Sequence, residues 1–245
     1  MPAWPGSAPA IPGTGDGVVL GTAPGGEPAI VPFFTATRGT RCAVIGDPAL
    51  PKVLALRALD AGARVQVVTS MPGDWFRLRG RVGPSAERLA VVGPGAPPPD
   101  ATGAEPWMIM DDTGAVLSGA TAASNPWQPF VAVSSARSIT VAALRGLDAI
   151  VLYRSSPACR AAVVAALRLP DSVVRSLHGI PSDTIAVASP GMVRLVPLRP
   201  DESECALFTE LGLPTWRNND CRPAPGLSAT NSFETKGTGT EEKVA

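Results

Sequence analysis

The chain has 245 residues, of which 45% are hydrophobic and 17% charged, so it is long and apolar enough to bury a sizeable core. Lys and Arg together number 21, as do Asp and Glu, and this zero net charge argues against a nucleic-acid binder and against a polybasic membrane anchor. No stretch approaches the roughly 18 apolar residues of a membrane-spanning helix, so we expect a cytoplasmic protein that reaches a membrane only through a partner.

Segments at both ends of the chain differ in composition from the middle. Residues 1–16 are dominated by Pro and Gly, and residues 215–245 are largely polar. Such segments offer few side chains that can pack into a core. We therefore predict one α/β domain over residues 17–214, with disordered segments at 1–16 and 215–245.

Apolar runs alternate with helical spacings through the first half of the predicted domain. Pro24-Gly25-Gly26 is a turn that joins the first two strands, and Gly62 is well placed to end the first helix. The predicted strands are 18–20, 30–34, 41–45, 64–69 and 89–92, and the predicted helix is 51–61.

The second half continues the alternation. A hairpin is predicted over 107–117, and Ser138 is a plausible cap for the helix that follows the next strand. The predicted strands are 130–133, 149–152, 184–188 and 193–198, and the predicted helices are 138–146, 157–167, 171–178 and 202–211. This pattern is typical of an α/β fold with a mostly parallel sheet covered by helices and antiparallel hairpins at its margins.

The four cysteines are widely spaced, and the chain has a single histidine. No pair of cysteines has the close spacing of a structural zinc site, so no metal is expected. We interpret all four as small buried residues in a reducing cytosol. They are Cys42, Cys159, Cys205 and Cys221.

The most informative stretch is RCAVIGDPALPKV, Arg41 to Val53. A phosphate-binding P-loop follows a strand, opens a helix and has the form G-x-x-x-x-G-K-[ST]. Gly46 stands at the first glycine, Asp47 follows it, and Lys52 stands at the lysine. Pro51 replaces the second glycine and lacks an N–H group, and Val53 replaces the hydroxyl that holds magnesium. Taken alone, the stretch is better explained by an ordinary strand-to-helix loop with a Lys on the first helical turn.

The segment before this loop, VVLGTAPGGEPAIVPFF, reads as strand, Gly, turn, Gly, Pro and strand. It resembles the lead-in to the P-loop of FtsK/SpoIIIE-type ATPases, including the EccC ATPase of type VII secretion, where a hairpin of the form h-G-x-x-x-x-G-x-P precedes the Walker strand. The resemblance covers residues 18–69 and extends more loosely to 198. It implies a degenerate relative of that class and an actinobacterial type VII secretion setting.

An acidic pair ends the apolar run Trp107 to Met110. Asp111 and Asp112 fit a Walker B strand, whose acid positions magnesium and water. The alternative interpretation, which we favour from sequence, is a hairpin with its turn at 111–114. Trp127 lies in a loop before a strand, where it could bind a protein partner or cover the edge of the sheet.

Two functions follow from these observations. The first is a non-catalytic accessory or interaction protein with a degenerate P-loop ATPase-like fold, without a cofactor, whose partner is a secretion ATPase or another secretion component. The second is a weak nucleotide-binding protein or low-activity ATPase that binds ATP and magnesium through five residues. These are Gly46, Asp47, Lys52, Asp111 and Asp112.

Overall fold

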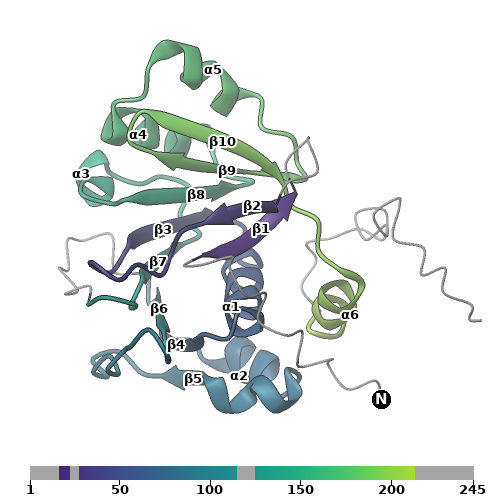
Figure 1. The fold of residues 1–245 in the computed structure, drawn as a ribbon. Helices are drawn as coiled ribbons and strands as arrows, with labels where there is room; N and C mark the ends of the chain where they lie inside the picture. The colour runs from purple at the N-terminus through teal and green to yellow at the C-terminus, as the bar shows by residue number, and fades with distance from the viewer. Residues whose placement is uncertain (1–16, 23–27, 115–124, 213–245) are drawn as a thin grey trace, which may run out of the picture.

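The computed structural model describes residues 17–22, 28–114 and 125–212 (Figure 1). The predicted terminal segments 1–16 and 215–245 lie outside these ranges. The described residues form an α/β fold with an eight-stranded, mostly parallel sheet and a separate two-stranded hairpin. The predicted fold class is therefore confirmed.

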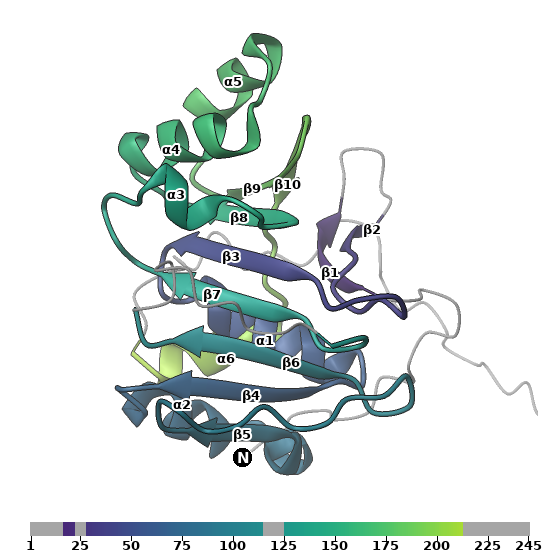
Figure 2. The same cartoon turned by 90° about the vertical axis from the view of Figure 1, so that its left-hand side faces the viewer.

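The eight strands of the main sheet lie in the order β10-β9-β8-β3-β7-β6-β4-β5, which Figure 2 shows as a stack. Neighbours from β8 to β5 pair in parallel, whereas β9 pairs antiparallel with β8 and β10. The strands are β3 (Arg41–Gly46), β4 (Arg64–Thr69), β5 (Leu89–Val92), β6 (Trp107–Asp112), β7 (Phe130–Ser134), β8 (Ala149–Tyr153), β9 (Thr184–Ser189) and β10 (Met192–Pro197).

The central strand β3 was predicted from its apolar run and is confirmed. Its residues 42–45 are all buried, because the strand has a parallel neighbour on each edge and a layer of side chains on each face. Helix α1 (Leu50–Asp60) follows it, and nine of its residues are buried.

Two hydrophobic clusters cover the two faces of the sheet. One face carries α1, α6 (Glu202–Glu210) and the hairpin of β1 (Val18–Thr22) and β2 (Pro28–Val31). The other face carries α3 (Val141–Leu144), α4 (Pro157–Leu167) and α5 (Asp171–His178), which lie together over β8, β9 and β10 in Figures 1 and 2.

Most predicted elements have their expected places, with four differences. The turn predicted at 111–114 was wrong at its start, because Asp111 and Asp112 belong to the strand β6, which pairs in parallel with β4 and β7. The return strand predicted at 115–117 lies outside the described residues. The helix predicted from residue 138 is only the single turn α3, capped by Thr140. The second strand ends at Val31. Two elements after β4, the helix α2 (Gly73–Arg79) and the 3-10 helix η1 (Gly83–Arg88), were not predicted.

The cysteines divide into two kinds. Cys42 and Cys159 are free and buried, as expected, and burial with the nearby Asp148 charge raises the pKa of Cys42 to about 12. Cys205 is disulfide-bonded, so the expectation of a free thiol was wrong there. Cys221 lies outside the described residues. Among the described residues no helix is long and apolar enough to cross a bilayer.

Candidate functional site

The loop that resembles a P-loop leaves the carboxyl end of β3, between the ends of β7 and β8. From β3 the chain runs through α1 to β4, which lies beyond β7 and β6, whereas β8 lies on the opposite side of β3. In open α/β sheets, ligands bind outside the carboxyl ends of the strands at such a switch point. The loop therefore lies where this fold would place a ligand.

The backbone N–H groups of the loop already have partners within the protein. Asp47 N–H donates to the Tyr153 carbonyl (3.1 Å), Ala49 N–H to Asp47 Oδ1 (2.9 Å), and Leu50 N–H to the Asp47 carbonyl (3.2 Å). Positions 48 and 51 are prolines, which have no N–H group. Over positions 47–51, therefore, no backbone donor remains for a phosphate.

The side chain of Asp47 holds the loop closed. Its Oδ1 atom accepts from a loop amide, as a bound anion would accept from the amides of a P-loop. Its Oδ2 atom lies 3.6 Å from Nη1 of Arg154, which follows β8. An acidic side chain of the protein thus takes part of the place that a phosphate would need.

Gly46 is required by packing. Its φ is +124°, and a Cβ atom at this position would lie 1.8 Å from the Tyr153 carbonyl oxygen. The absence of a side chain lets the end of β3 approach β8, with which it pairs. The first glycine of the motif therefore has a structural reason that involves no nucleotide.

Lys52 points into the protein. Its side chain is 5% exposed, and Nζ donates to the Pro48 carbonyl (3.1 Å), lies 3.8 Å from Asp74 Oδ2 and stands 5.2 Å from the ring centre of Trp75. Burial lowers the pKa of Lys52, and the charges of Asp74, Asp112 and Asp47 only partly offset this effect. The ammonium group is thus enclosed by its own loop and by α2.

The two aspartates at the end of β6 have different surroundings. Successive side chains of a strand point to opposite faces, so Asp112 lies on the face of α1 and α2 and Asp111 on the other. Asp112 Oδ2 accepts from Trp75 Nε1–H (2.7 Å), whereas Asp111 Oδ1 accepts from the backbone N–H (3.0 Å) and hydroxyl (2.7 Å) of Thr113. The structure brings Asp112 into the surroundings of Lys52 and leaves Asp111 apart.

Trp127, the residue considered for partner binding, is half-buried and packs against the main hydrophobic cluster. Its backbone lies in the left-handed region, with φ of 60°, and bonds to Thr35 and Trp107 on neighbouring segments. The Trp127 ring lies against Gly103.

The sequence analysis gave no role to Asp74 and Trp75, which complete the surroundings of Lys52. Both lie on α2, which was not predicted because its seven residues are too few for a clear helical period. The only available signal was a tryptophan in a chain whose aromatic content is 5%.

Within the described part of the chain, no three His, Cys, Asp or Glu side chains are grouped as a metal ion would require. No protein-family model matches the chain, and no curated protein is significantly similar to it.

Proposed function

We propose that this chain is a non-catalytic accessory or interaction protein built on a degenerate P-loop ATPase-like fold, with a role linked to type VII secretion. One observation carries the non-catalytic part: over positions 47–51 every backbone N–H group is bonded within the protein or replaced by proline, and Val53 lacks the hydroxyl that would hold magnesium. A P-loop needs these groups together to bind a triphosphate.

The strand order supports a P-loop ancestry. The strand before the loop, β3, lies between β7 and β8, and β6 with its acidic end lies beyond β7. The strand before the loop and the strand with the acidic end are therefore separated by one strand, β7. Asp112, at the end of β6, shares the face on which Lys52 lies.

The link to secretion depends on the segment before the loop. Its antiparallel pair, β1 and β2, packs on α1, and Gly21 lies so close to the end of β10 that a Cβ atom there would be 2.3 Å from the Pro197 carbonyl oxygen. The proposed partner is a secretion ATPase or another secretion component. The proposed location is the cytoplasm, with membrane contact only through that partner.

A weak nucleotide-binding function is the second candidate, and the shared surroundings of Lys52 and Asp112 favour it. For this function, Lys52 would have to leave the Pro48 carbonyl and Asp47 would have to release the Ala49 amide. Each good charge-assisted hydrogen bond contributes about 1.5–3 kcal/mol. Two missing interactions correspond to about a hundred-fold to ten-thousand-fold weaker binding.

Titration calorimetry with ATP, with and without magnesium, separates the two candidates. We expect no magnesium-dependent binding tighter than roughly millimolar and no hydrolysis above background. Asp112→Asn and Asp111→Asn form a matched pair, since only Asp112 lies on the Lys52 face. Micromolar binding that Lys52→Ala or Asp112→Asn abolishes, and Asp111→Asn does not, would establish the second candidate.

The secretion link needs a separate measurement. Biolayer interferometry with the purified FtsK/SpoIIIE-type ATPase of the same cell's type VII system should show saturable binding. Absence of binding to this ATPase and to the other purified secretion components would remove the link and leave the non-catalytic assignment unaffected.

A further inference from the structure

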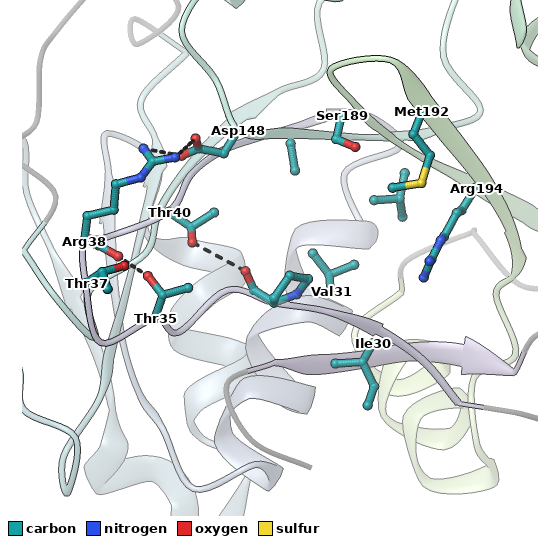
Figure 3. A pocket seen from close by; sticks show the side chains of 13 residues that line it. Ile30, Val31, Thr35, Thr37, Arg38, Thr40, Asp148, Ser189, Met192 and Arg194 are labelled. Carbon is teal, nitrogen blue, oxygen red and sulfur yellow. Dashed lines mark hydrogen bonds and ion pairs between the residues drawn. The ribbon is translucent and has the colours of Figure 1, made fainter.

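A pocket of about 430 Å³ lies at the end of the sheet opposite to the loop (Figure 3). It opens between the hairpin strand β2 and the strands β8, β9 and β10, at the amino end of β8. Its volume is within the roughly 300–1,000 Å³ of small-molecule sites. Its apolar lining includes Ile30, Val31, Ala149 and Val187.

One wall of the pocket is fixed by hydrogen bonds. Asp148 Oδ2 accepts from the Arg41 backbone N–H (2.8 Å) and from Arg38 Nη1 (3.3 Å), and its Oδ1 atom is paired with Arg38 Nη2. The Thr35 hydroxyl donates to the Arg38 carbonyl. The charge of Arg38 is therefore neutralised by Asp148, and this wall is preformed.

The opposite wall presents a second positive charge. Arg194, on β10, is exposed and extends toward β2 beside Met192 in Figure 3. Among the described residues, none forms a hydrogen bond or ion pair with its guanidinium group. The hydroxyl of Ser189 lies in the same lining.

We propose that this pocket binds a small organic monocarboxylate with an apolar body. The charged residues of the lining are two arginines and one aspartate, which leave one positive charge. A planar guanidinium binds a carboxylate through two parallel hydrogen bonds. The apolar floor matches a hydrocarbon body, and the Asp148 carboxylate on the far wall disfavours a second negative charge, as on a phosphate monoester. The proposal does not depend on the function of the loop.

Octanoate is the probe, with octan-1-ol as its neutral counterpart of the same length. We expect saturable octanoate binding at about millimolar concentration or tighter, measured by calorimetry on the full chain. Methyl NMR signals of Ile30, Val31 and Val187 should shift, whereas those of Leu144 and Leu177, in the cluster on the other face, should not.

The matched variants are Arg194→Gln and Arg175→Gln. Both remove one exposed arginine, but Arg175 lies on α5, which packs against the other face of β10. Arg194→Gln should weaken octanoate binding about ten-fold, the low end for a charged hydrogen bond, and Arg175→Gln should not change it. The proposal would be overturned if octanol bound as tightly as octanoate, or if the two variants bound octanoate equally well. Shifts at other methyl groups, or no binding of octanoate, would also overturn it.

Discussion

The loop at the carboxyl end of β3 and the pocket at the amino end of β8 differ in how their charged groups are paired. At the carboxyl end of β3, the amides of positions 47–51, the Asp47 carboxylate and the Lys52 ammonium bond to other groups of the protein. At the amino end of β8, Asp148 is fully engaged, but within the described residues the Arg194 guanidinium has no partner beside an open pocket. The loop with P-loop-like residues therefore has its charged groups paired. Within the described residues, the pocket, which no sequence motif marks, has a charged group without a partner.

This difference shows that residues resembling a binding motif can be explained by structure alone. The Gly, the Lys and the acidic strand end near the loop each have a structural reason there: close packing, burial over Trp75 and a hydrogen bond to Trp75 Nε1. Ligand binding requires groups that the fold leaves unpaired, because bonded groups must first be released.

Among the variants that test this comparison, Gly46→Ala is expected to lower the free energy of unfolding most. The new methyl group would overlap the Tyr153 carbonyl and require a left-handed backbone, so we expect the free energy of unfolding to fall by about 4 kcal/mol. Gly62→Ala is the control, because Gly62 also has a positive φ, +91°, but nothing lies within 4 Å of a Cβ atom there. It should cost only about 1–2 kcal/mol. If urea unfolding showed similar losses of unfolding free energy for the two variants, Gly46 would be required only for its backbone conformation.

Removal of Glu204 should have the next largest effect, because its partner Arg57 connects α1, which follows the loop, with the hairpin, whose strand β2 lines the pocket. Arg57, on α1, pairs with Glu204 through Nε (2.8 Å) and Nη2 (2.9 Å) and donates to the Leu20 carbonyl of the hairpin (2.5 Å). The Glu204 side chain is only 3% exposed, so Glu204→Ala should lower the free energy of unfolding by about 3 kcal/mol.

Glu202→Ala, at an exposed position on the same helix turn, is the matched control and should cost at most about 0.5 kcal/mol. Equal losses in the two variants would mean that the ion pair does not hold the hairpin and α1 together.

The sequence predicted the fold well because its strongest signals are local. The alternation in β4, the apolar run of β5 and the proline at the start of α4 predicted these elements with the bounds that the structure has. The error at β6 arose because a run ending in Asp-Asp-Thr-Gly is equally compatible with a turn and with a strand end. Only the long-range pairing with β4 and β7 decides between them.

The candidate site was less predictable than the fold. The sequence placed Gly46, Asp47 and Lys52 at one strand-to-helix connection, as the structure does, with Gly46 ending β3 and Lys52 in the first turn of α1. It could not show that Asp47 would accept the hydrogen bond of Ala49. The pocket was not predicted at all, because Arg38, Asp148 and Arg194 are far apart in the chain and meet only through the order of the strands.

The smallest expected effect is a change in how steeply the free energy of unfolding varies with pH. It tests whether Lys52 is enclosed. Burial lowers the pKa of Lys52 from its usual 10.5, so the unfolded chain holds this proton over a pH interval in which the folded chain has released it. The free energy of unfolding of the wild type should therefore rise with pH through that interval, up to about 10.5. Lys52→Met should lack this rise.

The raised pKa of Cys42 acts in the opposite direction but is common to both proteins, so it cancels in the difference between their stability curves. Parallel curves from urea unfolding between about pH 8 and 10.5 would mean that the Lys52 ammonium is hydrated and free to meet a phosphate, and the contrast between the two ends of the sheet would be lost.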